Sequence, residues 1–162
     1  MDPFHGILLG FQVAFQPVNL MYCFAGVFLG TLIGVLPGIG PATAIALLLP
    51  ATTGISPATG IILLAGIYYG SMYGGSTTSI LVNIPGEAAS IVTCIDGHQM
   101  ARQGRAGPAL GIAAIGSFIA GTLGIVLLSL IAAPLARAAL AFGPAEYFSL
   151  MVLGLVLVSC LS

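Results

Sequence analysis

The stretch YYGSMYGGSTTSILVNIPG, Tyr68 to Gly86, places many polar and helix-breaking residues inside a long apolar part of the chain. No Asp, Glu, Lys or Arg occurs between Pro3 and Gly86. Lipid cannot hydrogen-bond to an opened backbone, so a polar interruption at membrane depth indicates a site. We predict a helix over 58–73, an unwound break at the glycines and hydroxyls of 74–79, and a short apolar piece over 80–84 before Pro85.

The composition indicates an integral membrane protein. Apolar residues make up 59% of the 162 residues and charged residues only 4%, whereas a soluble domain carries roughly 25% charged residues. Three arginines and no lysine cannot follow a phosphate backbone, which excludes a nucleic-acid partner. The three cysteines are far apart and show no metal-ligand spacing, so neither a metal site nor a cofactor is expected.

The first part of the chain predicts an interfacial helix over 1–16 and a membrane-spanning helix over 18–36. Glycines recur every fourth residue along the spanning helix, at Gly26, Gly30, Gly34 and Gly38, and again at Gly66, Gly70 and Gly74. Small residues at this spacing allow two membrane helices to approach closely.

A second interruption, Pro37-Gly38-Ile39-Gly40-Pro41, is followed by an apolar piece over 42–49 that is too short to cross a membrane. We interpret it as a half-helix, either re-entrant or part of a broken span; a plain surface loop is the alternative. Its first backbone N–H groups, at Ala42 and Thr43, lack intrahelical partners and attract carboxylates. Gly38 and Gly40 would let a ligand approach the backbone.

We interpret the two interruptions as opposite walls of one polar site for a substrate or ion. Hydroxyl oxygens, and carbonyl oxygens if the helix unwinds, would bind a small cation or an anionic ligand there, as in transporters with broken helices. The alternative for the hydroxyls is bonding to their own helical turn. The predicted site residues are Gly38, Gly40, Ala42, Thr43, Tyr73, Gly74, Gly75, Ser76, Thr77, Thr78, Ser79 and Asn83, with a transient coupling cation at Ser76 and Thr77.

The remaining chain predicts a turn over 51–57, with Ser56 as N-cap before Pro57. A polar loop over 87–107 then contains four of the seven charged residues, and two of its arginines favour a cytoplasmic location. A helix over 108–133 should end at Pro134, followed by an amphipathic link over 135–147. The apolar segment 148–162 stops abruptly, so we expect the transmembrane domain of 1–162 to be truncated at its carboxyl end.

Catalysis is not expected. His98 lies among charged residues of the polar loop, where we expect it to be solvated, and His5 lies near the amino terminus. Neither histidine is placed to activate a serine of the polar stretch.

The blocks GVLPGIGPATAIALLLP, residues 34–50, and GSMYGGSTTSILVNIPGEAASIVTCIDGHQMARQGRAGPALGIAAIGS, residues 70–117, resemble the large permease subunit of the bacterial tripartite tricarboxylate transporters. The resemblance covers roughly residues 30 to 160. It implies an all-α, multi-pass bundle in the bacterial inner membrane that forms one half of an inverted-repeat transporter.

The resemblance also implies secondary uptake of a tricarboxylate or related carboxylate, coupled to Na+ or H+. The implied partners are a periplasmic solute-binding protein, a small membrane subunit and the rest of the polypeptide. Two other functions remain open from the residues, a passive channel and a structural membrane subunit. A channel would be expected to show a continuous polar stripe, and a structural subunit needs no hydroxyl cluster.

The orientation of 87–107 is testable by labelling. A cysteine placed at Gln103 of the full-length protein, in a cysteine-free background, should resist a membrane-impermeant thiol reagent in whole cells, because the arginines hold this segment on the cytoplasmic side. Ready labelling from outside would reverse the predicted topology.

Overall fold

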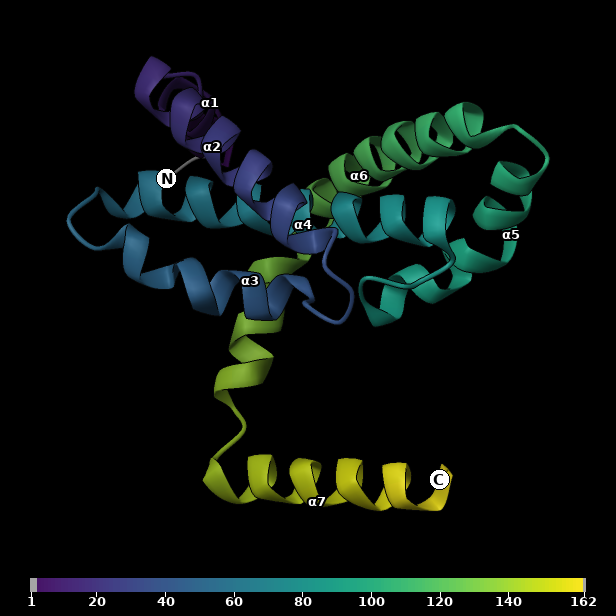
Figure 1. Ribbon diagram of the computed structural model, residues 1–162. Helices are drawn as coiled ribbons and strands as arrows, with labels where there is room; N and C mark the ends of the chain where they lie inside the picture. The colour runs from purple at the N-terminus through teal and green to yellow at the C-terminus, as the bar shows by residue number, and fades with distance from the viewer. Residues whose placement is uncertain (1–2, 162) are drawn as a thin grey trace. The chain divides into compact units, whose positions relative to one another are not determined.

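The computed structural model describes residues 3–161, and its regular elements over that range are all helical (Figure 1). The α-helices are α1 (Pro3–Ala14), α2 (Pro17–Gly34), α3 (Pro41–Leu48), α4 (Pro57–Val82), α5 (Ile91–Arg102), α6 (Ala106–Leu140) and α7 (Pro144–Leu161). Two short 3-10 turns, η1 (Leu49–Thr52) and η2 (Ala88–Ser90), complete the chain. Pro17–Gly34 and Ala106–Ala132 are long and apolar enough to cross a membrane. The prediction of an all-α fold is therefore confirmed for the described residues, and these two helices are its candidate membrane spans.

The chain forms two compact units, Met1–Ser117 and Phe118–Ser162. The first unit holds α1 to α5, the start of α6 and the residues of the predicted site. The second unit holds the rest of α6 and α7, whose large apolar side chains are exposed. Exposed apolar helix surfaces of this kind suit a lipid environment.

Glycine contacts between α2 and α4 organise the first unit. A Cβ atom built on Gly70 would lie 2.8 Å from Thr31 N and would also collide with Val27 O. Gly30 faces the backbone of Ile67 in the same way, and Gly34 faces that of Ser71. The predicted role of the four-residue glycine spacing is confirmed for these two helices. Gly38 does not continue it, because nothing lies within 4 Å of its Cβ position.

A buried polar network fixes the start of α4. Ser56 caps the helix by accepting a hydrogen bond from Thr59 N at 3.2 Å, and Pro57 occupies the first turn, as predicted. Thr59 Oγ1 donates to Asn19 Oδ1 at 2.7 Å, and Asn19 Nδ2 donates to Val13 O at 2.7 Å. Asn19, only 3% exposed, therefore ties α2 to both of its neighbours.

The predicted break at 74–79 is wrong. Helix α4 runs uninterrupted from Pro57 to Val82 and ends at Asn83, which adopts a left-handed conformation with φ 60°. The two glycines do not unwind the helix, because the absence of side chains serves close packing against α2 and against the segment after α4.

Three later boundaries also differ from the prediction. The polar segment 87–107 is not a loop, since it contains η2 and the twelve-residue α5. Helix α6 continues through Pro134 to Leu140, and α7 begins at Pro144, so the predicted link over 135–147 is largely helical. A proline removes one backbone hydrogen bond and disfavours the helix locally, but the flanking turns retain their own bonds and the helix persists.

The glycine contact predicts a strong steric effect. Gly70→Leu in the full-length protein should lower the free energy of unfolding by about 3 kcal/mol or more, because α2 backbone atoms leave no space and overpacking a core already costs roughly 1–3 kcal/mol. The thermal midpoint of the detergent-solubilised protein measures the loss. Gly111→Leu on α6, with nothing within 4 Å of its Cβ position, is the matched control. Equal midpoints for the two variants would contradict the assigned packing.

Candidate functional site

The first interruption is present as predicted. Helix α2 ends at Gly34. Helix α3 begins at Pro41, is eight residues long and has Gly40 as its N-cap. Gly38 has φ +82°, a left-handed value that glycine adopts without strain. Its N–H donates to Gly86 O at 3.1 Å. This bond joins the first interruption to the segment that follows α4.

The second interruption lies after the hydroxyl cluster, at 83–87. Its backbone passes so close to α4 that a Cβ atom on Gly86 would collide with Gly75 Cα and would lie 2.9 Å from Gly34 O. Three backbone segments therefore meet at Gly34, Gly75 and Gly86, which we call the glycine junction. Gly40 lies beside it, with its Cβ position 3.6 Å from Glu87 Cβ.

The four consecutive hydroxyls of residues 76–79 all donate to carbonyls one turn earlier on α4. The acceptor distances are 3.1 Å for Ser76 to Met72 O, 2.9 Å for Thr77 to Tyr73 O, 3.0 Å for Thr78 to Gly74 O and 2.8 Å for Ser79 to Gly75 O. The bonding of hydroxyls to their own turn is therefore the correct alternative for this conformation. Free carbonyl oxygens are expected only if the helix unwinds, and α4 is continuous over these turns.

One hydroxyl also reaches the first interruption. Thr78 Oγ1 lies 3.1 Å from Val35 O, just beyond the end of α2. Thr78 and Ser79 are buried, whereas Ser76 and Thr77 are half-buried. The structure thus brings Thr78 and Gly75 together with Gly38 and Gly40.

The other predicted residues occupy different positions. Ala42 and Thr43 are exposed in the first turn of α3, directly after Gly40. Tyr73 is half-buried, and Gly74 packs against α2 with its Cβ position 2.9 Å from Val35 N. Asn83 is exposed and forms the C-cap of α4, so its evident contribution is to end the helix.

Glu87 is the residue of this region that sequence reasoning missed. Its Oε2 atom is buried, has no hydrogen-bond partner and packs against Gly75, which has no side chain to exclude it. Its carboxylate accepts a hydrogen bond from Ser90 N, and Ser90 Oγ donates to Glu87 O at 2.9 Å. The sequence feature that could have pointed to Glu87 is its position as the first charged residue after the long uncharged stretch.

Burial alters the acidity of this side chain. Desolvation raises the pKa of Glu87 above its ordinary value of 4.5, and the hydrogen bond with Ser90 opposes the rise. The physical cause is that the charged form loses hydration when the carboxylate enters the junction.

His98 also differs from its predicted solvated position. It is half-buried on α5, and its Nδ1 atom lies 3.0 Å from Ile80 O near the end of α4. Gly97 packs against Ile80 in the same place, with its Cβ position 2.8 Å from Ile80 Cγ1. These contacts hold α5 against α4, immediately after the junction.

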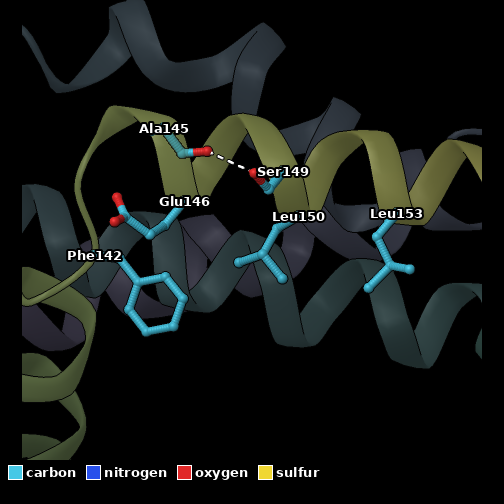
Figure 2. A pocket seen from close by; sticks show the side chains of 6 residues that line it. All are labelled: Phe142, Ala145, Glu146, Ser149, Leu150 and Leu153. Carbon is cyan, nitrogen blue, oxygen red and sulfur yellow. Dashed lines mark hydrogen bonds between the residues drawn. The ribbon is translucent and has the colours of Figure 1, made fainter.

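A groove in the second unit contains none of the predicted site residues. Figure 2 shows its lining along α7, with the Ala145–Ser149 hydrogen bond of 2.9 Å running along the helix. The lining residues are Phe142, Ala145, Glu146, Ser149, Leu150 and Leu153. One carboxylate on an open apolar surface does not form a site for an anionic ligand.

The helical fold, the apolar spans and the polar junction define this chain as a helical membrane protein. Residues 20–162 match the family described as the tripartite tricarboxylate transporter TctA family, and the chain belongs to this family. TctA is a transporter family, so the predictions of the family and of a non-enzymatic protein are both confirmed.

The chain is also similar to a protein from Agrobacterium vitis described as an uncharacterized 52.8 kDa protein in the TAR-I ttuC' 3'region. The two are 60% identical over 156 residues, which cover 96% of this chain and 31% of the relative. The chain therefore spans about a third of the length of the curated relative that it matches. No solved structure matches the chain.

The contact between Gly75 and Glu87 predicts a specific rescue. Gly75→Ala in the full-length protein should lower thermal stability, because the methyl group would occupy the space of the Glu87 carboxylate. A second change, Glu87→Ala, should restore most of the loss, with a coupling energy of about 1–3 kcal/mol between the two positions.

Gly74→Ala provides the matched control. Its Cβ would collide with the backbone of α2, so Glu87→Ala should not rescue it. Additive effects of Gly75→Ala and Glu87→Ala would contradict the assigned contact.

Proposed function

We propose that this chain is part of the membrane permease subunit of a secondary transporter in the bacterial inner membrane, which takes up tricarboxylates or related carboxylates. Membership of the TctA family supports the substrate class. The observation that carries the proposal is the 3.1 Å hydrogen bond from Gly38 N, just before α3, to Gly86 O. Because Gly86 packs against Gly75, this bond connects the segment before α3 to α4.

The start of α3 has the chemistry to bind a carboxylate. The first backbone N–H groups of a helix have no intrahelical acceptor, and the helix dipole adds a partial positive charge. In α3 the first intrahelical bond is donated by Ala44, to Gly40 O at 3.1 Å, and Pro41 has no N–H. The N–H groups of Ala42 and Thr43 therefore remain for a ligand, and both residues are exposed.

The hydroxyls on α4 suit a cation better than a carboxylate. Their protons are directed to carbonyls of the same helix, so the oxygens of Ser76 and Thr77 have only lone pairs left to offer. A carboxylate needs donors, whereas Na+ needs oxygen acceptors. We therefore assign the carboxylate to the side of Gly38, Gly40, Ala42 and Thr43, and the coupling cation to the side of Ser76 and Thr77. Tyr73, Gly74, Gly75, Thr78, Ser79 and Asn83 complete the proposed site.

The proposed transport is driven by an ion gradient and involves other components. The tripartite description of the family supports two partners, a periplasmic solute-binding protein and a small membrane subunit. The relative's greater length supports a third component, the remainder of the same polypeptide. An inverted repeat of this chain in that remainder would place a second set of interruptions against the first.

Counterflow tests the proposal. The full-length permease and small subunit, reconstituted in liposomes, should exchange labelled for unlabelled tricarboxylate without net flux, which a channel or a structural subunit does not do. Gly40→Ala should raise the half-saturating tricarboxylate concentration by about tenfold to a hundredfold, because its methyl group would obstruct approach to the α3 N–H groups.

The fold should tolerate this change, since the Cβ position of Gly40 is 3.6 Å from its nearest neighbour, an ordinary contact. Gly116→Ala on α6, where nothing lies within 4 Å, is the control and should leave counterflow unchanged. Wild-type counterflow in Gly40→Ala would remove the first interruption from the site.

A further inference from the structure

Glu87 is a carboxylate for which the described part of the chain provides no cationic side-chain partner. Its Oε2 atom is buried against Gly75, at the glycine junction, without a hydrogen-bond partner. Burying one oxygen of a half-buried carboxylate disfavours its charged form, and a positive group or a proton relieves that cost.

The elements around Glu87 do not supply a positive side chain. Helices α2, α3 and α4 contain no charged residue, and their titratable groups are Tyr22, Cys23, Tyr68, Tyr69 and Tyr73. Helix α5 adds Cys94, Asp96, His98 and Arg102. Arg102 and Asp96 are exposed, and His98 is engaged with Ile80 O. Within residues 3–161, neutralisation of Glu87 is therefore left to a mobile cation.

A backbone carbonyl at the junction adds a second acceptor. Gly34 O ends α2, and its two intrahelical donors are lost because Pro37 has no N–H and Gly38 N bonds to Gly86 O instead. Gly34 O lies 2.9 Å from the Cβ position of Gly86, next to Glu87 in the chain. The carboxyl end of a helix also carries a partial negative charge. Two electronegative groups thus flank the same glycines.

We propose that Glu87 binds the small monovalent cation, H+ or Na+, whose gradient drives transport, with the end of α2 as its neighbour. This inference rests on the proposed function and adds the charged ligand that the hydroxyls of α4 lack. With the cation bound, the neutralised carboxylate remains in the notch at Gly75. Without it, the carboxylate is drawn toward water, which disturbs the Gly38–Gly86 bond and the carboxylate site at α3. Cation and substrate binding are then linked through the junction.

Two measurements, a sodium arm and a proton arm, distinguish Na+ from H+ as the cation at Glu87. Neither requires a carboxylate substrate. In the sodium arm, purified full-length protein is titrated with radioactive Na+ at fixed pH, and Glu87→Gln should weaken binding by about tenfold or more. In the proton arm, thermal midpoints are compared in Na+-free buffer as pH rises from 4.5. Because the folded pKa is raised, the wild type should lose stability relative to Glu87→Gln as pH passes through that pKa.

A transport measurement tests coupling. Glutamine has the shape of protonated glutamic acid, so Glu87→Gln should keep tricarboxylate counterflow but lose accumulation driven by the Na+ or pH gradient. Glu87→Asp, which keeps the charge but shortens the side chain, should weaken the cation response without removing it. Glu146→Gln, an exposed glutamate of α7, is the matched control and should behave as wild type.

The results separate the two proposals. Wild-type behaviour of Glu87→Gln in both binding arms, or accumulation driven by the gradient as in the wild type, would overturn the role of Glu87. An absence of tricarboxylate counterflow in the wild-type protein would instead overturn the proposed function, while the binding arms would still report on Glu87.

Discussion

Direct backbone contact between α2 and α4 is the constraint on which the first unit depends. In a membrane the hydrophobic effect does not drive helices together, so close van der Waals packing must contribute most of the association. The Cβ positions of the glycines at 26, 30 and 34 face backbone atoms of α4, and those at 66, 70 and 74 face backbone atoms of α2. This contact determines where α2 can end, because the interruption after Gly34 emerges directly beside the middle of α4.

The glycine junction extends the same principle to the polar residues. The Cβ position of Gly75 is occupied by the Glu87 carboxylate, while Gly86 allows the returning chain to touch α4. The junction thus places a charged group, a helix end and the start of α3 within one small region. A cation and a carboxylate bound there would interact strongly, because the low dielectric constant of the surroundings weakens screening.

The direction in which the hydroxyl protons point decides whether the cluster suits a cation or an anion, which the residue types alone do not show. A threonine on a helix can donate to its own turn or to a ligand, and in this structure all four hydroxyls of the cluster donate to carbonyls of α4. Donors for an anion must then come from the backbone. The start of α3 supplies backbone N–H donors. It does so without a cationic side chain, and the sequence before Glu87 contains no Lys or Arg.

The sequence by itself determined the membrane class, the family, the glycine packing stripe, the half-helix after Pro41 and the cap at Ser56. These features depend on local composition, fixed spacing or the chemistry of a single turn. Only the tertiary structure decided that Gly74 and Gly75 pack rather than unwind, and that Glu87 belongs to the junction rather than to a solvated loop. A glycine pair is compatible with either a break or a close contact, and the difference is set by a neighbour distant in sequence: α2 for Gly74 and Glu87 for Gly75.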